Sequence, residues 1–482
     1  MKKIIAFFLI FLAFSSCQKY EDLNKNVKDP TSVSGESLFT GAQKALFDIM
    51  VTPNVNRNIY RLITQQWTET TYIDESNYDL VTRTIMDNQW NIMYRDVLQD
   101  FKRAYSVISS TSYLPSEDVN QKLNRLAVVE VMIVFCYSTC VETWGDVPYS
   151  ESLNPDIILP KYDDGLTVYK DLITRINAAI QQLAINPSAG SLGGADNMYG
   201  GDVNLWLKFA NSLKLHMGLL LADVDPAFGK TAAEEAAPGV MKSNADNAKI
   251  VYLSAQPNNN PVNENLVLSG RNDFVPANTL VDVMNNLADP RRPLYFTMFG
   301  DAYVGGIYGA SNDFYAYSHV ADQLQVATFE GTIFDYAQTE FLLAIATERG
   351  WNVGGTAADH YNYGVGASII YWGGTVDDIV AYLTNPLVSY QTAAGDWKQK
   401  IGTQMWIALY NRGFEAWTQW RMLDYPQLVA PPDAETDNGL PPLRYPFPIS
   451  EQTLNGANWA VAADKLLPLG DVMEAKLFWD KN

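Results

Sequence analysis

The sequence predicts a mostly α-helical protein whose helices are joined by long irregular loops. Apolar residues recur at intervals of three and four along several segments, which is the period of an amphipathic helix. Strict alternation of apolar and polar residues, which marks a half-buried strand, is scarce. With 47% hydrophobic and 18% charged residues, the composition is that of an ordered globular chain.

The predicted helices differ in how much of their surface is apolar. Segments 166–183 and 206–220 each carry one apolar stripe and predict amphipathic helices. The stretch 123–140 is apolar on nearly all sides, which predicts a helix buried between its neighbours. In chain order, we expect helices near residues 35–50, 90–109, 123–140, 166–183, 206–220, 338–349, 356–371 and 397–420.

Two neighbouring helical segments suggest a scaffold of helical hairpins. Phe341-Leu-Leu-Ala344 followed by Tyr361-Asn-Tyr-Gly-Val-Gly-Ala367 is similar to a degenerate tetratricopeptide-like pair, although no fixed repeat period can be counted. Loops of unusual length in a compact domain are usually functional. Such loops are expected at residues 184–200, 250–275, 290–335 and 425–448. Because no segment has the low complexity of a linker, residues 17–482 are expected to form a single domain.

The N-terminus has the features of a bacterial export signal. Two lysines precede the apolar run 4–14, and Ser15-Ser16 leads directly to Cys17. A helix of that length spans about 16 Å, which is half of the ~30 Å hydrocarbon layer and too short for a transmembrane helix. The pattern is similar to a lipobox, so we expect residues 1–16 to be a lipoprotein signal peptide and Cys17 to carry lipid, followed by a short tether. An ordinary secretory signal with an incidental cysteine is the alternative.

The charge of the chain excludes some partners. The net charge is −20, from 54 acidic against 34 basic residues. A protein that binds the phosphate backbone needs a cationic face, so we expect no nucleic-acid partner. The same charge repels anionic membranes, so lipid on Cys17 is expected to provide the membrane attachment.

The sequence contains no recognisable catalytic constellation. It has no G-x-S-x-G, G-x-x-x-x-G-K-[ST], H-E-x-x-H or C-x-x-C motif. The three histidines, at positions 216, 319 and 360, are scattered, and each is expected to be packed or at the surface. Cys136 and Cys140 share one face of an apolar helix and are expected to be inert buried thiols. We therefore expect no enzymatic activity, no catalytic residues, no cofactor and no metal site.

Aromatic residues in two loop regions are the candidates for ligand binding. A sugar ring presents C–H faces that stack on tyrosine or tryptophan, while its hydroxyls bind polar side chains. Residues 67–83 and 300–320 contain this mixture, whereas Trp206, Trp406 and Trp417 lie on apolar helix stripes and are expected in the core. The candidate ligand-binding residues are Trp67, Tyr72, Tyr78, Tyr303, Tyr308, Asn312, Tyr315 and Tyr317.

An ordered series of short segments resembles the SusD/RagB family, specifically its SusD-like nutrient-binding lipoprotein branch. No single segment is specific, but the series runs through most of the chain. Its members are Asp22-Leu-Asn-Lys25, Trp144-Gly-Asp-Val-Pro-Tyr149, Pro160-Lys-Tyr-Asp163, Tyr199-Gly-Gly-Asp202, Lys208-Phe-Ala-Asn-Ser-Leu213, Asp289-Pro-Arg291, Glu340-Phe-Leu-Leu-Ala344, Tyr361-Asn362, Gln404-Met-Trp406, Glu415-Ala-Trp417 and Tyr445-Pro-Phe-Pro-Ile-Ser-Glu451.

The resemblance implies a SusD-like helical fold on the outer face of the outer membrane. Glu21-Asp22, shortly after Cys17, is similar to the surface-export signal of Bacteroidetes lipoproteins. The resemblance also implies a partner, a SusC-like TonB-dependent transporter on which the protein acts as a lid, delivering oligosaccharides or peptides. Two alternatives from other classes remain: a surface glycan hydrolase and a structural adhesin lipoprotein.

Overall fold

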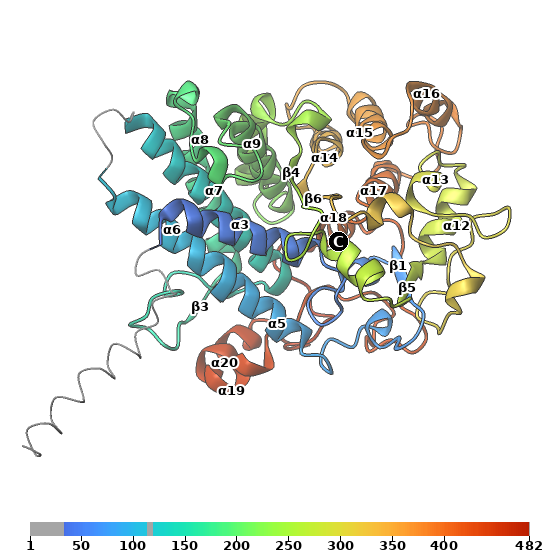
Figure 1. Ribbon diagram of the computed structural model, residues 1–482, viewed down its shortest axis with the longest axis horizontal. Coiled ribbons are helices and arrows are strands. Elements are labelled where there is room, and N and C mark those ends of the chain that lie inside the picture. Colours follow the sequence, from blue (N-terminus) through green and yellow to red (C-terminus); the bar gives the residue numbers. More distant parts are fainter. Residues whose placement is uncertain (1–32, 113–118, 482) are drawn as a thin grey trace, which may run out of the picture.

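The computed structural model describes residues 33–112 and 119–481 of the chain. The predicted signal peptide, Cys17 and the predicted tether lie outside these residues. Helices dominate the described part, as the sequence predicts, and they form two groups that lie side by side (Figure 1).

The first group is built from the N-terminal half of the chain. In this group α3 packs on α6, α6 on α7, α7 on α8, α8 on α9 and α9 on α10, so helices that follow one another in the sequence are mostly neighbours in space. This arrangement is the helical-hairpin scaffold that the sequence predicts. Its helices are α3 (Gly35–Val51), α5 (Ile85–Asn91), the π-helical turn η2 (Ile92–Leu98), α6 (Gln99–Ser110), α7 (Val119–Trp144), α8 (Gly165–Ile185), α9 (Val203–Leu220) and α10 (Pro226–Ala236).

The second group comes from the C-terminal half and packs on the first through contacts between α14 and α9. Here α14 packs on α15, α17 on α18, and α17 on both α14 and α15. Its helices are α14 (Tyr336–Glu348), α15 (Ala357–Trp372), α16 (Val376–Thr384), α17 (Trp397–Ala408) and α18 (Gly413–Leu423), with α4 (Tyr60–Ile63) against α18 and α19 (Ile449–Leu454) and α20 (Gly456–Asp464) near the first group.

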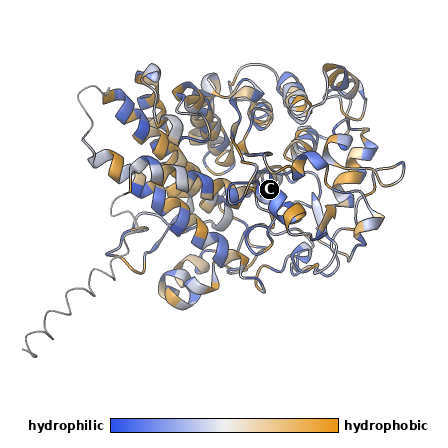
Figure 2. Ribbon diagram, in the orientation of Figure 1, coloured by the Kyte–Doolittle hydropathy of each residue, from blue (hydrophilic) through white to orange (hydrophobic). Residues whose placement is uncertain are grey.

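Side-chain caps set the first residues of several of these helices. Asp164 accepts a hydrogen bond from the Thr167 N–H at the start of α8, and Asp202, Asp335 and Thr356 cap α9, α14 and α15 in the same way. Such caps satisfy backbone N–H groups that have no partner within the helix. Figure 2 shows hydrophilic and hydrophobic residues alternating along helices such as α5 and α6, because one face of each turns toward the core and the other toward solvent.

Helix α7 is the central helix of the first group. Among the described residues it alone is long and apolar enough to cross a membrane, yet 89% of its most apolar window is buried inside the protein. The prediction of a helix surrounded by neighbours is therefore confirmed. Both Cys136 and Cys140 lie on it, buried and unpaired, and burial raises the pKa of both thiols.

The structure differs from the sequence prediction in several places. The single helix expected at 397–420 is two helices, α17 and α18, because the chain turns between them at Asn411, which adopts a left-handed backbone with φ of 67°. The side-chain Oδ1 of Asn411 accepts a hydrogen bond of 2.9 Å from Arg61 Nε, which holds this turn on a distant segment. The predicted loops also contain short elements, including α11 (Pro261–Asn263), the π turn η7 (Glu264–Leu268) and α13 (Arg292–Tyr295), and the helix α12 (Asn278–Asn286), which was not predicted, lies between two of these loops.

The described residues form three two-stranded antiparallel sheets, two of which join segments that are far apart in the sequence. β1 (Trp67–Glu69) pairs with β5 (Phe274–Pro276), and Trp67 lies opposite Pro276. β4 (Ala248–Val251) pairs with β6 (Glu330–Phe334), and β2 (Val147–Pro148) pairs with β3 (Tyr162–Asp163). The first of these sheets brings the loop after α4 against the segment that leads into α12.

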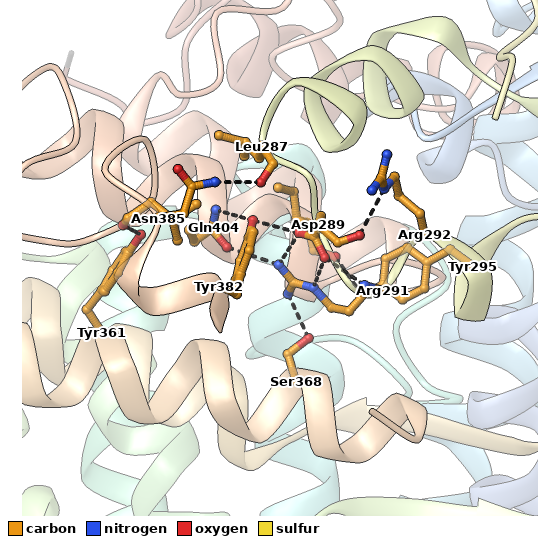
Figure 3. Close-up of polar contacts among 12 residues, drawn as sticks. Leu287, Asp289, Arg291, Arg292, Tyr295, Tyr361, Ser368, Tyr382, Asn385 and Gln404 are labelled. Carbon is orange, nitrogen blue, oxygen red and sulfur yellow. Dashed lines mark hydrogen bonds and ion pairs between the residues drawn. The ribbon is translucent and has the colours of Figure 1, made fainter. Parts of the chain in front are cut away.

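A buried ion pair fixes the segment around α13 to the second helix group (Figure 3). Arg291 and Asp289 are fully buried, and two guanidinium–carboxylate hydrogen bonds of 2.9 and 2.6 Å join them. Arg291 also donates to Ser368 of α15 and Gln404 of α17, at 3.0 Å each. The Tyr382 hydroxyl of α16 donates to Asp289 at 2.7 Å. One charge pair therefore holds three helices in place.

Candidate functional site

The two aromatic loop regions singled out in the sequence meet in the structure. The backbone N–H of Asn312 donates to the carbonyl of Thr70 at 2.9 Å, and the Ser311 hydroxyl donates to the same carbonyl at 3.1 Å. From the other loop, the Asn77 amide donates to the carbonyl of Gly309 at 2.9 Å. The two loops therefore form one continuous surface, which we call the loop junction.

The side chain of Asn312 holds the loop junction together. Its Nδ2 donates to the carbonyl of Glu69 in the first loop, at 3.0 Å. Within its own loop, Nδ2 donates to the carbonyl of Ala310 at 2.7 Å, while Oδ1 accepts from the N–H of Ile307 at 2.8 Å. The amide is 95% buried and connects the two loops, so its place is inside the junction.

Three of the predicted aromatic residues also lie in the interior. Trp67, the first residue of β1, is buried, and its Nε1 donates to the hydroxyl of Tyr410 at 3.0 Å. Tyr78 is fully buried, and its ring lies 6.3 Å from that of Tyr308, whose hydroxyl donates to the carbonyl of Leu62 at 2.6 Å. With Asn312, these rings support the two loops from below and do not face solvent.

The other four predicted residues have surface area available. Tyr72 and Tyr315 are 68% and 73% exposed, while Tyr303 and Tyr317 are half-buried. The hydroxyl of Tyr315 accepts a hydrogen bond of 3.3 Å from the amide of Asn272, which brings a third segment to the junction. Exposed tyrosine rings on either side of a polar segment are suited to stacking on flat apolar faces of a ligand.

A depression of about 230 Å³ lies beside Tyr72, and we call it the Tyr72 pocket. Its polar lining includes Arg83, Arg271 and Asp273, together with asparagine side chains from residues 54–56 and from Asn265. Arg271 is paired with Asp273 at 2.5 Å. Arg83 belongs to the first aromatic loop of the sequence prediction, whereas residues 265–273 were not among the predicted ligand-binding residues, because they contain no aromatic ring that would distinguish them.

A pair of carboxyl groups lies under the Tyr72 pocket. Glu69 lines the pocket, and its Oε2 accepts hydrogen bonds from the backbone N–H and hydroxyl of Ser76 at 2.8 and 2.9 Å. Burial and the nearby charge of Glu75 raise the pKa of Glu69 to about 9, and burial raises that of Glu75 as well, although Glu75 is paired with Arg83. Glu69 therefore holds a proton at neutral pH and is a hydrogen-bond donor there.

Glu69→Gln is expected to change how the stability of the protein depends on pH. The folded wild type keeps the Glu69 proton up to about pH 9, whereas an unfolded glutamate loses it near pH 4.3. Unfolding thus releases a proton, and this residue makes the wild type less stable as the pH rises through that window. Glutamine cannot titrate, so the stability of the variant relative to the wild type should rise by up to about 1.4 kcal/mol per pH unit.

Urea unfolding at pH values from 5 to about 9 measures this difference. Glu435→Gln, at an exposed position, is the matched control and should follow the wild type at every pH. If the free energies of unfolding of Glu69→Gln and the wild type changed with pH in the same way, Glu69 would be charged in the folded protein.

The side chains of the three histidines contact other residues of the protein. His216 lies 3.2 Å from Glu142 and 3.1 Å from Gln419 in the core, and His360 lies 2.6 Å from Glu340. His319 stacks on Phe314 with ring centroids 3.9 Å apart. Within residues 33–112 and 119–481, no group of three or more His, Cys, Asp or Glu side chains is arranged to hold a metal ion.

A second depression, of about 500 Å³, lies between α6, α7 and α8. Lys102, Glu130, Tyr149 and Arg175 line it, and Arg175 donates to Tyr149 at 2.6 Å and to Glu130 at 2.5 Å. Lys102 donates to the backbone carbonyls of residues 152 and 153, so each of these polar groups has a hydrogen-bond partner within the protein. This depression is distant in sequence from the loop junction and has no exposed pair of aromatic rings.

Comparisons with known proteins give a consistent result. The profile of a SusD-like family described as "Starch-binding associating with outer membrane" matches residues 26–448. A solved chitin-binding protein is 26% identical over 93% of this chain and 100% of its own, with a TM-score of 0.79. A SusD homologue from Bacteroides uniformis is 25% identical over 92% and 99% of the two chains, with a TM-score of 0.78.

A third solved structure supports the fold alone. It is a chitin-binding SusD homologue from Flavobacterium johnsoniae, 24% identical over 92% of this chain and 99% of its own, with a TM-score of 0.77. No curated protein sequence matches the chain.

Proposed function

Because the chain belongs to the SusD-like family of outer-membrane-associated starch-binding proteins, we propose that it captures oligosaccharides at the cell surface and passes them to a transporter. The observation that carries this proposal is the loop junction, where Tyr72 and Tyr315 are largely exposed beside a polar pocket. Sugar rings have apolar faces for such tyrosines and hydroxyls for the neighbouring amides and guanidinium groups. A peptide is the other ligand class that the sequence leaves open.

The site is suited to weak capture. Two or three aromatic contacts contribute roughly 0.5–1.5 kcal/mol each, and with a few hydrated hydrogen bonds they give dissociation constants on the order of micromolar to millimolar. A ligand held this weakly is released readily, which suits a protein that delivers its ligand. Attachment beside a transporter raises the local ligand concentration at the transporter without any new contact.

Tyr315→Ala is expected to weaken oligosaccharide binding by about two- to tenfold, because it removes one stacking surface. Titration calorimetry of the full-length lipoprotein in detergent, against starch- and chitin-derived oligosaccharides, measures the effect. Tyr363→Ala is a matched control, since Tyr363 is 56% exposed on α15 and far from the junction in the sequence. Equal affinity of Tyr315→Ala and the wild type would remove Tyr315 from the binding surface.

The transporter partner in this proposal is a SusC-like TonB-dependent barrel, with the chain acting as its lid. A ligand favours lid closure only by its differential affinity for the closed state, so bound sugar has to contact both proteins when the lid is closed. Affinity purification from the native membrane should recover a large barrel protein together with this chain. Recovery of the chain alone would contradict the pairing.

Cys17 supplies the membrane attachment in this proposal. Each buried methylene contributes roughly 0.8 kcal/mol, so several acyl chains on one cysteine give firm anchoring at the outer membrane. Treatment of intact cells with an impermeant protease should cleave the protein, because it lies on the outer face. Survival of the protein while a known surface marker is removed would contradict this location.

The two alternative functions make different predictions for the same ligands. A surface glycan hydrolase would shorten a polysaccharide during incubation, whereas the proposed binding protein returns it intact. A structural adhesin would show no saturable binding of soluble oligosaccharides or peptides. Product analysis by chromatography and a binding titration therefore separate the three functions.

A further inference from the structure

The Tyr72 pocket is one end of a longer groove. A depression of about 420 Å³ adjoins it, and the two share Asn54, Asn265 and Ser269 in their linings. A third depression, of about 510 Å³, adjoins the second, and Asp48 lines both. We call these the middle pocket and the far pocket, and the row of three the amide groove. It follows the C-terminal part of α3 and the chain segment from β4 to β5.

Side-chain amides line all three pockets of the amide groove. A side-chain amide carries both donors and an acceptor, and a sugar hydroxyl likewise donates and accepts, so the two groups are complementary. The six amide residues that line the groove are Asn54, Asn56, Asn197, Gln256, Asn258 and Asn265. The exposed apolar side chains of Val251 and Leu253 lie in the far pocket, where a sugar face can pack.

Three polar side chains of the groove are not used by the fold. Arg57 lines the middle pocket, and Asn197 and Asn258 line the far pocket; all three are exposed. Within residues 33–112 and 119–481, their side chains form no hydrogen bond or ion pair, although the backbone of each is bonded. Their donors and acceptors are therefore available to a ligand.

The groove is nearly neutral in a protein with a net charge of −20. Its basic residues are Lys44, Arg57, Arg83 and Arg271, and its acidic residues besides Glu69 are Asp48, Glu264 and Asp273. Lys44 is paired with Asp48 and Arg271 with Asp273, so most of these charges are balanced within the groove. Glu69 adds no charge at neutral pH because its pKa is raised to about 9. A strongly charged ligand would gain little here.

We propose that the amide groove binds an extended, uncharged polysaccharide chain that runs from the exposed rings of Tyr72 and Tyr315 through the middle pocket to Asn197 and Asn258. This proposal rests on the proposed function, since it extends the same binding site. It names the ligand class as neutral glycan and makes affinity depend on chain length. Each added sugar residue occupies more of the groove and contacts more of its amides.

Titration calorimetry of the full-length lipoprotein in detergent tests the chain-length dependence. The probes are malto- and chito-oligosaccharides of about three to about eight residues, with oligogalacturonates of the same lengths as charged counterparts. For the series that binds, we expect the dissociation constant to fall at least tenfold from the shortest to the longest neutral chain. Oligogalacturonates should bind more weakly than neutral chains at every length.

Variants separate the two ends of the groove. Asn258→Ala and Arg57→Ala should weaken binding of the longest chains about three- to tenfold and leave the shortest chains unaffected. Tyr315→Ala should weaken both. Gln181→Ala removes an exposed amide from α8, outside the groove, and is the matched control with unchanged affinity at every length. The side chains of Arg57 and Asn258 form no hydrogen bond or ion pair within the described residues, so these two variants are expected to fold normally.

The outcomes distinguish this inference from the proposed function. Equal affinity for short and long chains, or no effect of Asn258→Ala and Arg57→Ala on long chains, would overturn the groove while leaving oligosaccharide capture intact. Tighter binding of oligogalacturonates would overturn the neutral ligand class. Failure of every neutral chain to bind would overturn both proposals.

Discussion

Arg291→Ala is expected to destabilise the protein by about 3–5 kcal/mol, because it leaves the carboxylate of Asp289 buried without its counter-ion. Arg291 is fully buried, and the substitution removes its two hydrogen bonds to Asp289. The substitution also removes the donors to Ser368 and Gln404, so α15 and α17 lose their common anchor. Urea unfolding followed by tryptophan fluorescence measures the change.

Arg95→Ala is the control for this prediction. Arg95 is paired with Asp96, but its side chain is 72% exposed, and solvent screens such a pair so that it contributes little to stability. We therefore expect the two variants to differ by several kcal/mol although each removes one arginine from one ion pair. A loss below about 1 kcal/mol for Arg291→Ala would show that the cavity rehydrates or that Asp289 takes up a proton at low cost.

Asn312→Ala is expected to weaken oligosaccharide binding more than tenfold, a larger loss than Tyr315→Ala causes. The amide is buried, so the loss comes from displacement of the loops and not from a missing contact with the ligand. The carbonyl of Glu69 and the N–H of Ile307 lose their partner, and each unsatisfied buried group costs about 1–3 kcal/mol. The loops that carry Tyr72 and Tyr315 then separate.

The same titrations measure the binding of this variant, and urea unfolding measures its stability. Asn458→Ala is the matched control, because the Asn458 amide also bridges segments, donating to the carbonyls of Leu159 and Pro160 far from the junction. That variant should lose stability and keep its affinity. Unchanged affinity of Asn312→Ala would mean that β1 and β5 hold the loops in place without the amide.

The sequence predicted the helices better than the segments between them. Segment 123–140 shows why. A helix that is apolar on all sides is removed from water only when other helices surround it, and the structure places this segment in the buried helix α7. The division between α17 and α18 was missed because the turn at Asn411 depends on Arg61, which is 350 residues away in the sequence. No local pattern reports a contact of that kind.

The same distinction applies to the candidate site. Composition identified both aromatic loops, and the structure brings them together. Composition did not show that Tyr72 is exposed and Trp67 buried, because Trp67 is covered only when β1 pairs with β5, some two hundred residues later in the chain. Arg57, Asn197 and Asn258 were missed for another reason: single polar residues carry no period, and only the folded chain shows that they share one groove.

The hydrogen bond between Asn312 and Glu69 spans 243 residues. Contacts of such high sequence separation form late in folding, since the entropy of closing the intervening chain has to be overcome first. Synthesis proceeds from the N-terminus, so the first aromatic loop exists for some time without its partner. The loop junction is thus absent from every nascent or truncated chain that ends before the second loop, so such chains lack the surface on which Tyr72 and Tyr315 stand beside each other's loops.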